Sequence, residues 1–230
     1  AQVPSEAPSL APSLAPSSSL APSLAPSLAP SEAPTEPTTG APTEAPTEYI
    51  TVNTQIDGTS IAKRLMFDIS AQKDVTIESF KIHIGKRLKL EQLTRGVQVW
   101  TKSGTHVGFE TSRRPRRGDG EGWKRLPMAA FKNEGPGEYT DIDFHWRLKL
   151  SPRFDSTDLE IDAGSTRAFY FIFGKGFYAT EGTAVGNECS ESNEYIIIKE
   201  GTVLSSPRTI DDSWVGLWNG AVVLTETGSD

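Results

Sequence analysis

Residues 168–173 read Ala-Phe-Tyr-Phe-Ile-Phe, and this short run decides the fold class. It is rich in aromatic residues, and both of its alternating faces are apolar. Such a run is typical of a central strand of a β-sandwich, which other parts of the protein cover on both sides.

Strand-forming sequence extends outward from this run in both directions. Short segments rich in β-branched and aromatic residues, most of them with apolar and polar residues in alternation, are found at 65–70, 75–84, 97–102, 195–198 and 221–224. Within 75–84 the alternation slips at Glu78 and Ser79, which predicts a β-bulge. Turns that contain Gly, Asn or Asp separate the segments.

Helical patterns are scarce, since only residues 86–93 could form one or two helical turns. Many short strands separated by turns predict an all-β fold, an antiparallel β-sandwich of the jelly-roll or immunoglobulin-like kind. A closed β-barrel is the alternative architecture.

The N-terminal part of the chain has a different composition. Residues 1–48 hold 11 of the 16 prolines, five glutamates and no basic or aromatic residue, in a repeat of Ala-Pro-Ser-Leu that drifts into Pro-Thr-Glu. Frequent proline removes backbone donors, and too few bulky side chains remain to offset the entropy of ordering the chain. We therefore predict a disordered stalk over 1–48, either an O-glycosylated spacer or a plain linker, and a single β-sandwich domain over 49–230.

Composition also limits the partners. Residues 49–230 carry 23 basic and 25 acidic side chains, and this near-neutral balance gives no reason to expect nucleic acid as a partner. Every apolar run is too short to span a membrane. Cys189 is the single cysteine, so it can form no intrachain disulfide, and we expect it to be buried.

Several short motifs follow one another in a fixed order along the domain. They are residues 66–69, 71–77, 99–104, 108–110, 163–170, 181–186, 199–201, 206–208 and 218–220. In this order and spacing, the domain resembles a family of secreted proteins of diatoms and related stramenopiles that often carry Ser/Thr/Pro-rich low-complexity segments. The resemblance covers residues 64–224. It implies an extracellular β domain, at the cell surface or in the cell wall, and no particular activity or catalytic residue.

No catalytic set stands out in the sequence. His83, His106 and His145 are dispersed and lack the spacing of a zinc site, and neither a nucleophile elbow nor a phosphate-binding loop is present. His83 alternates with Ile82 and Ile84, which predicts that it lies on the outer, solvated face of a strand. These patterns predict a protein that is not an enzyme and has no cofactor, apart from the calcium considered next.

One row of acidic residues is a candidate cation site. Asp158, Glu160 and Asp162 are spaced two apart, which would place them on one face of a strand while Leu159 and Ile161 point inward. Calcium prefers carboxylate oxygens, so the row could hold this ion. The alternative is the charged, solvent-facing side of an edge strand.

An insert at 112–121 is strongly basic and departs from the family pattern. Its arginines are Arg113, Arg114, Arg116 and Arg117. Guanidinium groups pair well with sulfates and carboxylates, so the insert is a candidate site for an anionic polysaccharide. A processing site that ends at Arg117 and a solvated loop are the alternatives.

Trp100 is the candidate for carbohydrate stacking. It is out of phase with Val97 and Val99 and is therefore predicted on the solvent side of its strand. Burial is the alternative for a tryptophan.

These features predict a secreted, non-enzymatic structural or adhesive protein of the extracellular matrix or cell wall. Its partner would be an extracellular polysaccharide or a matrix protein. The alternative is a dedicated polysaccharide-binding module that uses the basic loop and exposed aromatic residues.

Overall fold

The structure is a computed structural model. It describes residues 47–55, 57–84, 96–110, 122–127, 138–144, 156–205 and 212–227. All of these residues belong to a compact unit that runs from Ala45 to Asp230. Residues 1–46 of the predicted stalk and the predicted helical turns at 86–93 lie outside the described residues.

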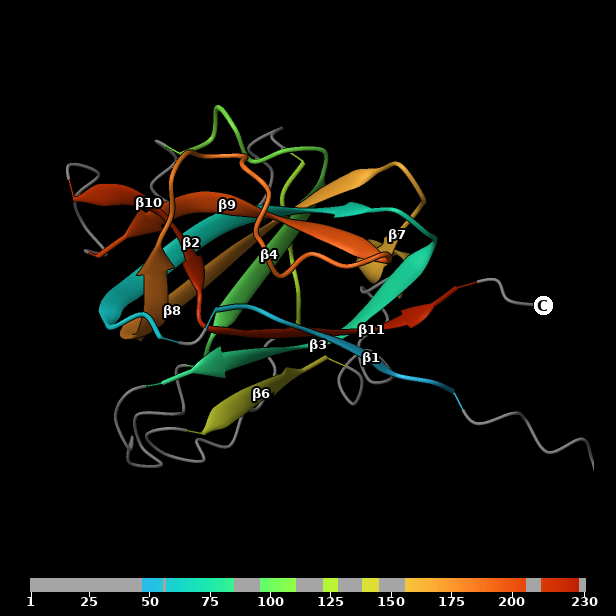
Figure 1. Ribbon diagram of the computed structural model, residues 1–230, viewed down its shortest axis with the longest axis horizontal. Coiled ribbons are helices and arrows are strands. Elements are labelled where there is room, and N and C mark those ends of the chain that lie inside the picture. The colour runs from blue at the N-terminus through green and yellow to red at the C-terminus, as the bar shows by residue number, and fades with distance from the viewer. Residues whose placement is uncertain are drawn as a thin grey trace, which may run out of the picture. The chain divides into compact units, whose positions relative to one another are not determined.

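The described strands form two antiparallel sheets that pack against each other (Figure 1). The five-stranded sheet has the order β1 (Ile50–Asn53), β11 (Gly220–Glu226), β3 (Val75–His83) and β6 (Tyr139–Asp143), with β7 (Glu160–Ile161) paired to β3. The six-stranded sheet has the order β10 (Ser213–Trp218), β9 (Ile196–Leu204), β2 (Ser60–Ala71), β8 (Thr166–Glu181), β4 (Gln98–Ser103) and β5 (Lys124–Arg125). A short 3-10 helix, η1 (Ser156–Leu159), precedes β7. The structure confirms the predicted all-β antiparallel sandwich.

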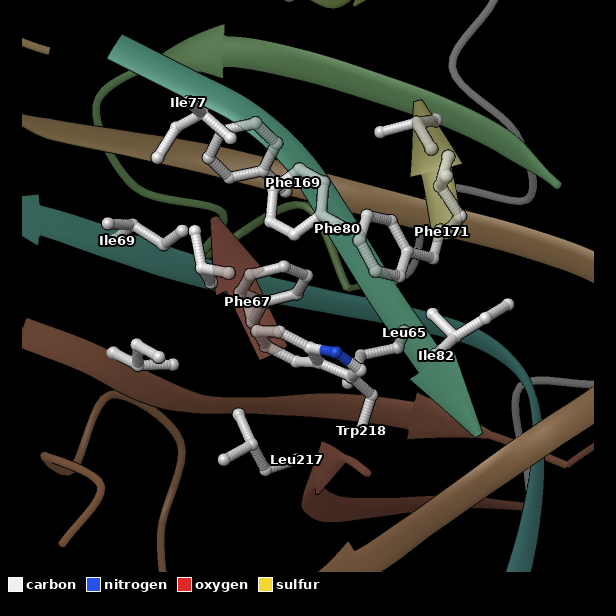
Figure 2. Packing of buried hydrophobic residues seen from close by; sticks show 14 of the residues in the cluster. Leu65, Phe67, Ile69, Ile77, Phe80, Ile82, Phe169, Phe171, Leu217 and Trp218 are labelled. Atoms are coloured by element: carbon white, nitrogen blue, oxygen red, sulfur yellow. The ribbon is translucent and has the colours of Figure 1, made fainter. Parts of the chain in front are cut away.

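Aromatic side chains from both sheets fill the space between them (Figure 2). The ring of Phe67 lies 4.3 Å from that of Trp218, measured between centroids. Phe80 of the opposite sheet packs edge-on against Phe169 at 5.1 Å and against Phe171 at 5.0 Å. All five residues are fully buried. Each buried aromatic side chain of this kind stabilises the fold by about 1.5–3 kcal/mol relative to leaving it in water.

The predicted bulge is present in β3. Ile77 pairs with Leu224 and Ser79 pairs with Val223, so Glu78 is an extra residue on its strand. The extra residue restores the alternation, which lets the apolar residues on both sides of the bulge face the core.

β8 is longer than the run that predicted it, with 16 residues. Its first part pairs with β2 and β4, and its last part pairs with the start of β2 and with β10. The pairing with β2 is interrupted around Gly174 and Gly176. Gly176 has a φ of 86°, which residues with a side chain rarely adopt. Because these glycines break the apolar pattern, the sequence predicted only the first part of the strand.

The turn at Asn219 and Gly220 carries the chain from β10 in one sheet to β11 in the other. Asn219 is fully buried, accepts a hydrogen bond from the Thr180 hydroxyl at 2.8 Å and donates one to the Gly58 carbonyl at 2.9 Å. A Cβ atom at Gly220 would collide with the Lys81 carbonyl oxygen. The turn therefore fixes the place where the two sheets meet.

Candidate functional site

Trp100 lies on the face of β4 that points away from the core, as its alternation predicts, but it is only 8% exposed. It belongs to a second group of buried residues, which we call the outer-face cluster. The members are Met66, Trp100, Trp123, Ala168, Tyr170 and Ile172, with Phe109 packed against them. The prediction of a solvent-facing platform at Trp100 is wrong, because rings such as Trp123, 6.0 Å from Tyr170, cover this face of the sheet.

Asp68 and His106 form a buried pair beside the outer-face cluster. Asp68 pairs in register with Ala168 of the cluster. The Nδ1 atom of His106 lies 2.8 Å from Oδ1 of Asp68, and the His106 backbone N–H donates to the same oxygen at 2.9 Å. The Thr105 hydroxyl donates to the second carboxylate oxygen at 2.5 Å. No local spacing in the sequence signals this pair, because the two residues are 38 positions apart.

The surroundings of Asp68 favour its ionised form. Burial alone would raise the pKa of this carboxyl, but hydrogen bonds from His106 and Thr105 and the charge that His106 can carry outweigh it and hold the pKa below its ordinary value. Nε2 of His106 has no hydrogen-bond partner in the part of the chain that the structure describes. The pair is a clamp, in which a carboxylate on β2 fixes the loop that follows β4.

The three acidic residues of the predicted calcium site do not share one strand. Asp158 belongs to η1, Glu160 to β7, and Asp162 follows β7. Leu159 and Ile161 do point inward, with 2% and 3% of their surface exposed. The 3-10 turn changes the residue period, so the alternation assumed for a strand begins only at Glu160.

Two basic side chains contact Asp158, the first residue of this row. Lys124 Nζ is 2.6 Å from Oδ1 of Asp158, and Arg167 donates to the Asp158 carbonyl at 2.8 Å. Burial lowers the pKa of Arg167, while the charges of Asp158, Asp162 and Glu160 oppose that shift. Among the described residues, no group of three or more His, Cys, Asp or Glu side chains is arranged to hold a metal ion. Asp158 is thus ion-paired with Lys124, and its backbone carbonyl is bound by Arg167.

The arginines of the basic insert, and the candidate processing site at Arg117, lie outside the described residues. The flanks of the insert are described, and they meet on the outer-face cluster, where the rings of Phe109 and Trp123 are 6.4 Å apart. Lys102 Nζ lies 3.5 Å from the centroid of the Phe109 ring. Both ends of the insert are therefore attached to the same face of the six-stranded sheet.

A row of partly exposed side chains crosses from one sheet to the other. Ile61 of β2 pairs in register with Tyr178 of β8, and the Tyr178 ring lies 5.0 Å from that of His83 on β3. His83 pairs in register with Tyr139 of β6, with their rings 6.5 Å apart. We call these four residues the junction stripe. His83 points outward as predicted, but between two tyrosines rather than alone.

Four of the sequence motifs come together in two pairs, in which a carboxylate of one motif supports the loop of the other. The Glu200 carboxylate accepts hydrogen bonds from the backbone N–H groups of Thr183 at 2.6 Å and Ala184 at 2.9 Å. The Asp74 carboxylate accepts one from the N–H of Ala163 at 2.6 Å. These motifs therefore hold turns at the ends of strands in place.

Cys189 is buried, as the sequence predicts. Burial, together with a hydrogen bond to Glu191 at 2.6 Å, raises the pKa of its thiol to about 12. Because a thiol with this pKa carries almost no thiolate at neutral pH, Cys189 is a poor nucleophile.

The class of protein that these features define is an antiparallel β-sandwich with loops held by carboxylates. Comparisons with protein-family models, curated proteins and solved structures find no match to the chain. In the described segments, no helix has the length and apolar character that crossing a membrane requires.

Proposed function

We propose that this chain is a secreted, non-enzymatic adhesive or structural protein of the extracellular matrix or cell wall. In this proposal, the β-sandwich binds a partner through its surface and the N-terminal segment serves as a stalk. The resemblance to secreted proteins of diatoms and related stramenopiles supports an extracellular location, which is part of this proposal.

The observation that carries the proposal is that carboxylates hold loops in fixed positions. Asp68, Asp74 and Glu200 each accept hydrogen bonds from the backbone of a neighbouring loop. A carboxylate held in this way sets the geometry of the loop whose backbone it binds. Loops that are fixed before a ligand arrives favour binding, because less conformational entropy is lost on association.

The composition of the first 48 residues supports a role in presentation. A chain of this length in the polyproline II conformation reaches about 150 Å, at about 3.1 Å per residue. A stalk of this reach would hold the domain away from the surface to which the protein is attached.

Adhesion of the full chain to extracellular polysaccharide tests the proposal. Microspheres that carry the chain are placed on films of alginate, cellulose and chitin, and the force that detaches them is measured. The sugars in solution are analysed in parallel. We expect attachment above that of albumin-coated microspheres without release of sugar fragments. Attachment at the albumin level on every film, or the appearance of cleaved sugars, would contradict the proposal.

Binding of anionic polysaccharide by the basic insert is a second candidate function. The observation that favours it is the attachment of both flanks of the insert to one face of the sheet, which also presents the exposed strand β5 (Lys124–Arg125). Replacing Arg113, Arg114, Arg116 and Arg117 by serine should shift elution from a heparin column to lower salt, because fewer ion pairs form. Unchanged elution would remove this candidate.

A further inference from the structure

We propose that the junction stripe, formed by Ile61, Tyr178, His83 and Tyr139, is a binding site for a neutral polysaccharide chain. The inference rests on the proposed function, because it assumes that the domain works by binding. It names the binding surface and the chemical class of the ligand. The aromatic residues that contact the ligand are those of the stripe and not Trp100, which is buried.

The central part of the stripe is held rigidly by the turn between the sheets. The backbone N–H of His83 donates to the carbonyl of Asn219 at 2.8 Å, and the N–H of Asn219 donates to the carbonyl of Tyr178 at 2.9 Å. One buried residue therefore fixes the two strands that carry the closest pair of rings. Binding to such a surface requires little further ordering of the protein.

The side chains of the stripe are amphipathic, as are sugars. Tyrosine and histidine combine apolar rings with polar tips, and Ile61 adds an aliphatic contact that is 46% exposed. The planes of the His83 ring and its two tyrosine neighbours, Tyr178 and Tyr139, differ by 63° and 77°, so the surface is ridged rather than flat. A sugar chain presents apolar C–H faces and hydroxyl groups in turn along its length, which suits such a row.

The charges beside the stripe favour a neutral ligand. Lys81 precedes His83 by two residues on β3, and Asp141 follows Tyr139 by two residues on β6, so both lie on the same face as the stripe. Lys81 Nζ is 3.9 Å from Oδ1 of Asp141. These opposite charges compensate each other, which gives an anionic polysaccharide no advantage at the His83–Tyr139 end of the stripe.

The dimensions of the stripe favour a chain-like ligand over a folded protein. Its four residues form a single row: Ile61 and Tyr178 stand on paired strands, as do His83 and Tyr139, and the rings of Tyr178 and His83 are 5.0 Å apart where the two pairs meet. A stable protein interface buries about 800 Å² on each partner and uses about 20–30 residues on each side. A narrow row of rings fits an extended ligand better.

Titration calorimetry of the full chain with cellohexaose, laminarihexaose and chitohexaose tests the site. We expect binding to at least one of the three. We also expect Tyr178→Ala and Ile61→Glu to weaken it by about tenfold or more, as for anchor residues of other interfaces. The matched control is Tyr195→Ala, which changes a partly exposed tyrosine that precedes β9 and lies beside the far end of β2, away from the stripe. Ile61→Glu changes an exposed residue, so it tests the site even if the loss of Tyr178 destabilises the domain.

The outcomes separate this inference from the proposed function. If the chain adheres to polysaccharide films but the stripe variants bind the three hexasaccharides as well as the native chain does, the site is wrong and the function stands. If the native chain binds none of the three hexasaccharides, the proposed site is also wrong. A self-association that only the stripe variants abolish would identify the surface as a protein interface and would contradict the inference. Loss of all adhesion by the native chain would overturn both proposals.

Discussion

Nδ1 of His106 lies 2.8 Å from Oδ1 of Asp68, and both residues are enclosed on the outer side of the six-stranded sheet. The pair is 38 residues apart in the chain, and it joins a central strand to the loop that leads toward the basic insert. A buried carboxylate that accepts hydrogen bonds from backbone and side-chain donors makes the position of this loop part of the folded structure.

Removal of the Asp68 charge should change how stability depends on pH. The pKa of Asp68 is lower in the folded protein than the value of about 3.9 for an unfolded chain. Its contribution is therefore fully present above about pH 4 and is lost as the pH falls through the folded pKa. Asp68→Asn should lower the unfolding free energy at pH 6 by about 1–3 kcal/mol. Between pH 6 and pH 3 the unfolding free energy of the Asp68→Asn variant should fall by less than that of the native chain. Urea unfolding of both proteins at pH 6 and pH 3 measures the two decreases. Equal decreases would contradict the lowered pKa of Asp68.

Asn219 should be much more important for stability than its polar character suggests. Asn219→Ala removes the side-chain bonds to Thr180 and Gly58 in a fully buried turn and should lower the unfolding free energy by about 1–3 kcal/mol. Asn53→Ala, in an exposed position of β1, should change it by no more than about 0.5 kcal/mol. Chemical denaturation of the two variants compares them directly. Similar losses would show that the turn does not anchor the sheets.

Local patterns predicted the interior of the sandwich but not what covers its outer face. The segments 65–70, 75–84 and 168–173 became central strands because alternate burial leaves a period of two in the sequence. The phase of Trp100 was also predicted correctly. Its cover comes from Trp123 and the loop near Phe109, contacts that no short-range pattern encodes.

The same reasoning explains the elements that were missed. β10 carries a glycine among its apolar residues, and β5 has only two residues, so neither produces a recognisable pattern. The Asp68–His106 clamp and the junction stripe each combine residues from separate strands or loops. The only sign of them in the local sequence is an isolated polar or aromatic residue, such as Asp68 or His83, between apolar residues.

Trp100 should contribute to stability and not to sugar binding. Trp100→Ala removes a large side chain from the outer-face cluster and should cost about 3–5 kcal/mol of unfolding free energy. Trp100→Phe, which keeps most of the ring volume, should cost clearly less. Thermal melts of both variants, with calorimetry against the same hexasaccharides, provide the measurement. A folded Trp100→Phe variant that loses sugar affinity would restore the original prediction of a stacking site.

Cys189 should resist modification while the domain is folded. Its thiol pKa of about 12 leaves little thiolate at pH 8, and burial restricts access. A thiol-reactive dye should therefore label the native chain at least about tenfold more slowly than the chain in urea. Equal rates in the two states would show that the thiol is exposed.

Nuclear Overhauser spectroscopy of the full chain tests the central claim most directly, because that claim concerns the meeting of two sheets at one turn. The ring centroids of His83 and Tyr178 are 5.0 Å apart, and the backbones of these two residues are joined through Asn219. The account predicts strong cross-peaks between the ring protons of His83 and those of Tyr178. A folded chain in which these two rings show no cross-peaks would contradict both the junction and the site proposed upon it.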